Sequence, residues 1–183
     1  RYVTIEHAWN IRRAIGTGVK FVGIFVDTPT PIVQRVADHC RLDVVQLFGS
    51  ETRAAVETLR PRAFKAVTVT THDEAEQAVR AHPARRGATP SDPALLLHVA
   101  DGAVAPWTVV PSAARRLPVL IASSAIDPSS AGTVIREVRP WGVDVWDTVE
   151  VRPGEVDHAR LQALVAAVRA ADRTALAAAE AER

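Results

Sequence analysis

Short runs rich in β-branched residues alternate with longer amphipathic segments along this chain, and that alternation is its most constraining feature. The first run, at residues 19–26, is almost uniformly apolar, as expected for a strand buried on both faces of a parallel sheet. We expect further strands at residues 43–48, 64–69, 95–99, 118–122 and 142–146. The segments between them are Ala-, Arg- and Glu-rich, so the pattern predicts βα units on a parallel sheet.

Helix-start signals precede several of the amphipathic segments. Each is a small polar residue whose side chain can accept a hydrogen bond from the first free amide groups of the helix. Some are followed directly by proline, and one is followed three positions later by glutamate. These starts are Thr30-Pro31, Ser50, Thr71 with Glu74, and Asp127-Pro128. Further helices are expected at residues 4–15 and after residue 154.

A helix followed by six strand–helix units fits two architectures, an open doubly wound sheet and a closed eight-stranded barrel. No Gly-x-Gly-x-x-Gly motif follows an expected strand, which weighs against a dinucleotide-binding sheet. With 183 residues and 48% hydrophobic content the chain can bury one sizeable core. We therefore expect a single domain over residues 1–171 and a helical or frayed tail over residues 172–183.

Charge and cysteine content exclude several classes of function. The formal net charge is +1 and the basic residues are dispersed, so no nucleic-acid partner is expected. The apolar runs are too short to span a bilayer, and one cysteine cannot form an internal disulfide or a cysteine-based metal cluster. We expect a cytoplasmic protein without a membrane partner, as a monomer or a homodimer. The chain has no methionine and starts at Arg1, so we expect further residues upstream.

Several segments match, in order and spacing, the motifs of one enzyme family. They are RYVT at 1–4, VGIFV at 22–26, QLFGSE at 46–51, RPWGVDV at 139–145, VE at 149–150 and PG at 153–154. They resemble the motifs SPRYVS, VGVFV, QLHGxE and RPxGVDVSSGVExxPGxKD of phosphoribosylanthranilate isomerases. The agreement extends to about residue 168. Each motif is a moderate signal alone, and together in register they are a strong one.

The resemblance implies a (βα)₈ TIM-type barrel whose first one or two βα units would lie before Arg1. It implies an isomerase of tryptophan biosynthesis that converts N-(5'-phosphoribosyl)anthranilate to carboxyphenylamino-deoxyribulose 5-phosphate by an Amadori rearrangement, with no cofactor or metal. This small-molecule chemistry needs an acid to open the ribose ring, a base to move a proton from carbon 2, and a phosphate anchor. The family's base is a cysteine in a KxCG motif, expected here upstream of Arg1. Cys40 is interpreted as a structural thiol.

The position of the family's general acid differs in this chain. Where the family reads Leu-Leu-Asp, Leu96 and Leu97 are followed by His98. An imidazolium can donate a proton near neutral pH, so His98 is a candidate general acid, and Asp101 is a second candidate. The alternative interpretation makes His98 a polar strand-end residue. The segment at 101–107 replaces a Gly-rich loop with mostly larger residues, which hinders close backbone approach to a substrate.

Both walls of the implied phosphate site also differ from the family. Ser123, Ser124 and Ala125 replace the family's SGG ahead of a helix start, where serine hydroxyls and a helix N-terminus can still hold an anion. On the other wall Trp146 and Asp147 replace two serines. A carboxylate at that position opposes a phosphate dianion.

Other site positions match the family. Arg1 corresponds to an arginine that faces the anthranilate carboxylate in relatives, a group that a guanidinium fork suits, although a frayed terminal residue is the alternative. Gln46 and Asp144 match the family's strand glutamine and strand-end aspartate. These three residues are the expected substrate contacts. For Lys65 we expect a solvated or rim position.

Three functions are consistent with this pattern. The first is a divergent phosphoribosylanthranilate isomerase. The second is a barrel that has lost catalysis and serves as a binding module. The third is a related enzyme for a different, non-phosphorylated ligand, because an indole and a carboxylate at Trp146 and Asp147 suit an aromatic or cationic group.

Overall fold

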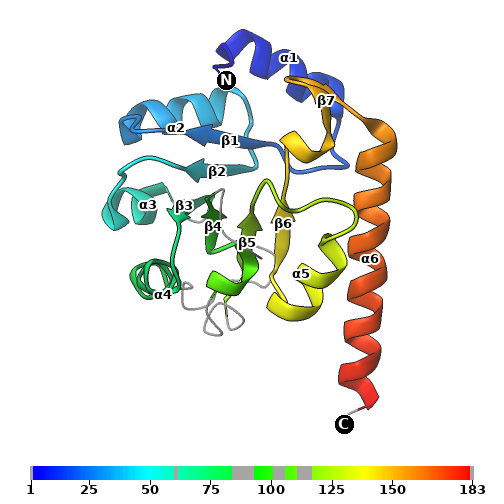
Figure 1. Cartoon of the computed structure of the whole chain (residues 1–183). Coiled ribbons are helices and arrows are strands. Elements are labelled where there is room, and N and C mark those ends of the chain that lie inside the picture. The colour runs from blue at the N-terminus through cyan, green and yellow to red at the C-terminus, as the bar shows by residue number, and fades with distance from the viewer. Residues whose placement is uncertain (1, 60–61, 84–92, 101–105, 111–116, 182–183) are drawn as a thin grey trace. The chain divides into compact units, whose positions relative to one another are not determined.

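The computed structural model describes residues 2–59, 62–83, 93–100, 106–110 and 117–181. The chain divides into two compact units, Arg1–Val67 and Thr68–Arg183. In each unit parallel strands alternate with helices along the chain (Figure 1). None of the helices in this described part is both long and apolar enough to span a bilayer.

The first unit holds three parallel strands in sequence order. Its elements are α1 (Ile5–Ile15), β1 (Val22–Phe25), α2 (Thr30–His39), β2 (Val44–Leu47), α3 (Arg53–Leu59) and the first part of β3 (Ala63–Val69). β1 pairs with β2, and β2 pairs with β3, both in parallel. All four residues of β2 are buried, which is the pattern of a strand covered on both faces.

The core of the first unit joins α2 and α3 to the strands. Its buried members are Val33, Ala37, Cys40, Leu42, Val45, Leu47, Val56 and Ala63. The side chain of Cys40 is fully buried in this cluster, and burial raises the pKa of its thiol. This is the place of a packing residue, as predicted for Cys40.

The second unit contains the remaining strands and helices. After the end of β3 come α4 (His72–Ala81), β4 (Leu95–Val99), η1 (Pro106–Val109), β5 (Val119–Ala122), α5 (Ala131–Val138), β6 (Gly142–Asp144), η3 (Asp147–Val149), β7 (Glu150–Arg152), β8 (Glu155–Val156) and α6 (His158–Ala181). β4 pairs with β5 and β5 with β6 in parallel, whereas β7 and β8 form an antiparallel hairpin. α5 buries one face and packs against α6 (Figure 1).

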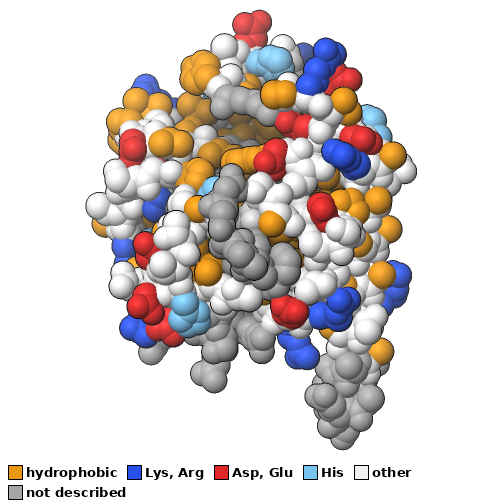
Figure 2. All heavy atoms as spheres, in the orientation of Figure 1, with side chains coloured by type: hydrophobic (Ala, Val, Ile, Leu, Met, Phe, Trp, Pro, Cys, Tyr) orange, Lys and Arg blue, Asp and Glu red, His pale blue; other side chains and the backbone are white. Residues whose placement is uncertain are grey.

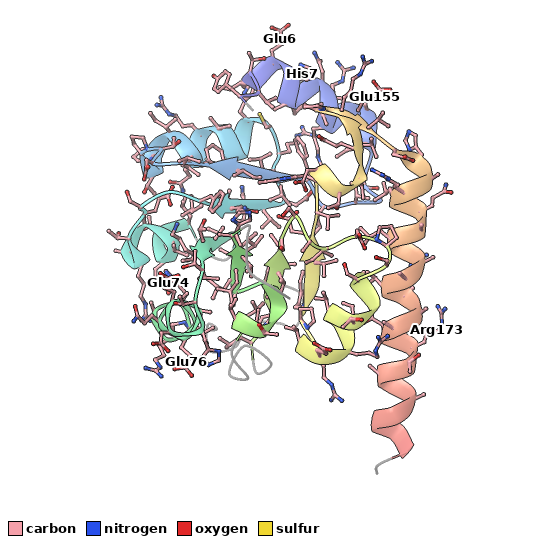
Figure 3. All side chains as sticks on the ribbon, viewed as in Figure 1. Glu6, His7, Glu74, Glu76, Glu155 and Arg173 are labelled. Carbon is pink, nitrogen blue, oxygen red and sulfur yellow. The ribbon has the colours of Figure 1, made fainter. Side chains whose placement is uncertain are left out.

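The capping box predicted at the start of α4 is confirmed. Thr71 Oγ1 accepts from the amide of Glu74, and the Glu74 carboxylate accepts from the Thr71 amide. Glu76 on the same helix pairs with His72 and Arg80 one turn away on either side. The surface around α4 therefore carries mixed charges (Figure 2), and Glu74 and Glu76, which are two residues apart, lie on different sides of the helix (Figure 3).

Three helix starts differ from the prediction. Thr30 does not cap α2, because it is the first residue of the helix, Pro29 is at the cap position and no side chain makes a cap hydrogen bond. Asp127 and Pro128 do not open α5, because the Asp127 carboxylate binds the amides of the next turn and the helix begins at Ala131. Ser50 does not cap α3, because its hydroxyl and amide both bind Asp27. The β7–β8 hairpin before the last helix was not predicted at all.

Candidate active site at the ends of β4, β5 and β6

Three residues lie in one row across the parallel strands of the second unit. His98 on β4 is the register partner of Ala122 on β5, and Ala122 is the partner of Asp144 on β6. Residues in register on adjacent parallel strands project their side chains to the same face of the sheet. The row therefore places an imidazole and a carboxylate on one face, with a methyl group between them.

A cavity of about 130 Å³ opens at these strand ends. It is lined by His98, Ala122, Ser123, Ser124, Asp144, Val145, Trp146 and Asp147. Six of the predicted site residues thus share one pocket, and they come from three strand ends and the loops that follow them. The ring centroids of His98 and Trp146 are 6.0 Å apart, so the indole forms part of the wall beside the imidazole.

Two carboxylates with different environments face this cavity. Asp144 is largely enclosed, and burial raises the pKa of its carboxyl above the ordinary value, while the charge of His98 acts in the opposite direction. Asp147 lies at the solvent-exposed rim. Among the lining residues that the structure describes there is no Lys or Arg. The described wall therefore offers acidic and neutral side chains, with His98 as its one basic side chain.

The serine segment beside the cavity, residues 123–126, forms hydrogen bonds within itself. Ser123 is buried, its Oγ accepts from the amide of Ala125 at 3.2 Å, and its carbonyl accepts from the amide of Ile126 at 3.1 Å. Ala125 is exposed and is not among the lining residues. Two amides that could approach an anion at this position are therefore already hydrogen-bonded within the loop.

The turn that follows, residues 127–130, is also hydrogen-bonded internally. Asp127 Oδ1 accepts from the amides of Ser129 at 2.7 Å and Ser130 at 2.9 Å, and the Asp127 amide donates to Ser130 Oγ at 3.0 Å. Hydrogen bonds, first from the Ser129 hydroxyl, lower the pKa of Asp127. The carboxylate thus occupies the amide groups ahead of α5 that a phosphate would otherwise use.

The structure describes only some of the other predicted site residues. Gln46 is buried in β2 of the first unit. Arg1 and Asp101 lie outside the described residues. The prediction for Lys65 was wrong, because its side chain is buried and its ammonium group is bonded to Glu51 at 3.0 Å.

Sequence reasoning missed two of the lining residues: Val145 and, more importantly, Ala122. It was predicted only as the last residue of a strand, and an alanine carries no chemical signal. Its importance comes from its register between His98 and Asp144, which depends on strand pairing. No group of three or more His, Cys, Asp or Glu residues in the described parts of the chain could hold a metal ion.

Comparison with known proteins identifies relatives over nearly the full chain. A family model described as N-(5'-phosphoribosyl)anthranilate (PRA) isomerase matches residues 1–167. The N-(5'-phosphoribosyl)anthranilate isomerase of Pseudomonas fluorescens (strain Pf0-1) is 30% identical over 169 residues, which cover 92% of this chain and 82% of the relative. That of Roseiflexus sp. (strain RS-1) is 34% identical over 163 residues, covering 84% of this chain and 71% of the relative.

Solved structures agree with the sequence matches. The crystal structure of phosphoribosyl anthranilate isomerase from Thermotoga maritima superposes with a TM-score of 0.79 at 25% identity, covering 92% of this chain and 82% of that one. A phosphoribosyl anthranilate isomerase in complex with reduced 1-(o-carboxyphenylamino)-1-deoxyribulose 5-phosphate gives a TM-score of 0.77 at 26% identity, with 92% and 81% covered. These likenesses confirm the predicted fold class, α/β of the (βα)₈-barrel type.

Proposed function

The chain belongs to the N-(5'-phosphoribosyl)anthranilate isomerase family, and we propose that it catalyses the Amadori rearrangement of N-(5'-phosphoribosyl)anthranilate in tryptophan biosynthesis. The observation that carries this proposal is the cavity shared by His98, Ser123, Ser124 and Asp144. Active sites of parallel βα barrels are built at the carboxyl ends of the strands. His98 and Asp144 occupy that position on β4 and β6.

His98 is the proposed general acid. Its imidazolium donates a proton to the ribose ring oxygen as the bond from that oxygen to carbon 1 breaks, and the nitrogen lone pair forms a C=N bond. A base then removes the proton of carbon 2, the electron pair forms the C1=C2 bond, and the C=N electrons return to nitrogen. Transfer of the enol proton to carbon 1 gives the ketone. No net oxidation occurs, so the reaction needs no redox cofactor.

The remaining roles in this proposal follow the family resemblance. The family's base is a cysteine, and Cys40 is not proposed for this role because it is fully buried in the core of the first unit. Arg1, Gln46 and Asp144 are assigned to substrate binding, and Asp101 is the second candidate acid. A biosynthetic isomerase of this kind is expected in the cytoplasm, as a monomer or homodimer acting on a small-molecule substrate.

The test is rescue of a tryptophan auxotroph that lacks this step, with the gene encoding the chain. We expect growth without tryptophan for the wild-type gene and its loss for His98→Ala. His98→Asp restores the acid of the family motif and should retain growth. Absence of rescue by the wild-type gene, with the protein present and folded, would refute the isomerase assignment.

Two features support a second candidate function: the internal hydrogen bonds of residues 123–130, and Asp147. The amides of Ala125, Ile126 and Ser130 are engaged within the chain, and the Asp147 carboxylate faces the same cavity. A phosphate dianion would meet an acidic rim here, whereas a neutral, aromatic or cationic group would meet Trp146 and Asp147 favourably. Such a barrel would act on, or simply bind, a non-phosphorylated ligand.

Inorganic phosphate distinguishes the two candidates. Its binding is measured by calorimetry for the wild type and for the double variant Trp146→Ser with Asp147→Ser, which restores the family's serines. If the double variant binds phosphate and the wild type does not, the second candidate, a barrel for a non-phosphorylated ligand, is favoured. Comparable affinity in both proteins would favour the isomerase, because the native wall would then already accept phosphate.

A further inference from the structure

We propose that Asp144 is a positioning residue that pairs with the His98 imidazole across Ala122 and fixes the orientation of its ring. The family motif has an aspartate where His98 stands, so relatives that follow the motif cannot form this pair. Its catalytic meaning rests on the proposed function, whereas the pairing itself can be tested without substrate.

The strand register brings the two groups together. His98, Ala122 and Asp144 are consecutive register partners on β4, β5 and β6, so their side chains leave the sheet on one face. Two strand spacings, roughly 10 Å, separate the outer backbones. Side chains of the length of an imidazole and a carboxylate can approach each other over this gap, and the Ala122 methyl group is too small to block them. All three residues line the same cavity.

The surroundings favour this pair over competing contacts. The other charged group facing His98 from the described elements of the cavity is Asp147 on η3, which is solvent-exposed and therefore well screened. Asp144 is more enclosed, so its interaction with His98 takes place in a medium of lower polarity. The Trp146 ring, 6.0 Å from the imidazole centroid, covers part of the site.

The pairing has a chemical consequence. A carboxylate beside an imidazolium stabilises the charged, proton-bearing form and fixes the orientation of the ring. In this way a histidine can serve where the family motif has a carboxylic acid. Asp144 would then act through His98 and not by donating a proton itself.

The experiment is an NMR titration of the Asp144 carboxyl carbon in the wild-type chain, in His98→Gln and in Asp147→Asn. Burial raises the pKa of Asp144 and His98 lowers it, so removal of the imidazole should move the Asp144 titration to higher pH. Asp147→Asn is the matched control, because it removes a carboxylate from the same cavity and should not raise the Asp144 pKa. An Asp144 titration unchanged in His98→Gln would overturn the proposal.

Two further readouts keep the test independent of folding and of turnover. In the unmodified chain the ring ¹⁵N signals of His98 should shift as Asp144 titrates, and no such shift would also overturn the pairing. With an active preparation, Asp144→Asn should lower kcat by up to about 100-fold, the lower end of what a general acid contributes, and change its pH profile. If the wild type shows no turnover but the titrations are coupled, the isomerase assignment fails and the pairing stands.

Discussion

The ammonium group of Lys65 lies 3.0 Å from Glu51 Oε2, and both side chains are more than nine-tenths buried. Lys65 Nζ also donates to the carbonyls of Leu47 at 3.1 Å and Gly49 at 2.6 Å. Glu51 in turn accepts from the amides of Gly49 at 2.8 Å and Asp27 at 2.9 Å. A single ion pair therefore connects the loops after β1 and β2 to β3 within the first unit.

Replacing Lys65 with Met should destabilise the protein by about 3–5 kcal/mol, because it leaves the Glu51 carboxylate buried without its cation. The measurement is the free energy of unfolding from urea denaturation. The control is Arg62→Met, which removes the exposed pair of Arg62 with Asp38 at 2.8 Å and should cost about 1 kcal/mol or less. Equal losses in the two variants would show that burial of the Lys65 pair has no special importance.

Acid should destabilise the chain through Glu51. Burial raises the pKa of Glu51, but hydrogen bonds from Lys65 and from backbone amides outweigh burial and hold the pKa below its ordinary value. Glu51 therefore binds a proton more readily in the unfolded chain than in the folded chain. Its contribution to the free energy of unfolding is present above the ordinary glutamate pKa and is lost as the pH falls through the lowered pKa of the folded state. Unfolding free energies measured along this pH range should decline less steeply in Glu51→Gln. In Glu57→Gln, which changes an exposed glutamate, the wild-type slope should persist.

Much of the architecture was predictable because it depends on local patterns. The fully apolar run before His98 predicted β4 with its observed bounds, Leu95–Val99, since a strand buried on both faces needs no alternation. The Thr71–Glu74 box predicted the start of α4, because both of its hydrogen bonds close within one turn.

The errors arose where a side chain had two possible partners. Asp127 can cap a helix or close a turn, and the sequence does not show that it binds the amides of Ser129 and Ser130 before α5 starts. From the sequence alone, Lys65 cannot be distinguished from an exposed lysine, because its ion pair with Glu51 is visible only in the folded chain. His98, Ser124 and Asp147 were each assigned to the site through the family motifs, and the structure shows that they line one cavity. Periodicity alone could not have singled them out.

Removal of the Asp127 carboxylate should loosen the turn before α5. Asp127→Ala frees the amides of Ser129 and Ser130 and should cost about 1 kcal/mol of unfolding free energy, as for loss of a helix cap. Asp127→Asn keeps an oxygen acceptor in the same place and should retain most of that stability. Urea denaturation of the three proteins checks the order, and an alanine variant as stable as wild type would contradict the role given to the carboxylate.

Gly49 should not tolerate even one added methyl group. A Cβ at this position would overlap the Asp27 carboxylate and lie 2.6 Å from the Asp27 amide nitrogen, and Asp27 already has a left-handed backbone with φ of 49°. Gly49→Ala should therefore displace Asp27 and cost about 1–3 kcal/mol, as in other overpacked sites. The control is Gly132→Ala in α5, where the Cβ meets only the flexible end of Arg136 at 3.2 Å and alanine has the higher helix propensity. Thermal unfolding should show a lower Tm for Gly49→Ala and an unchanged or higher Tm for Gly132→Ala, and the reverse order would mean that Asp27 can move away from Gly49 without cost.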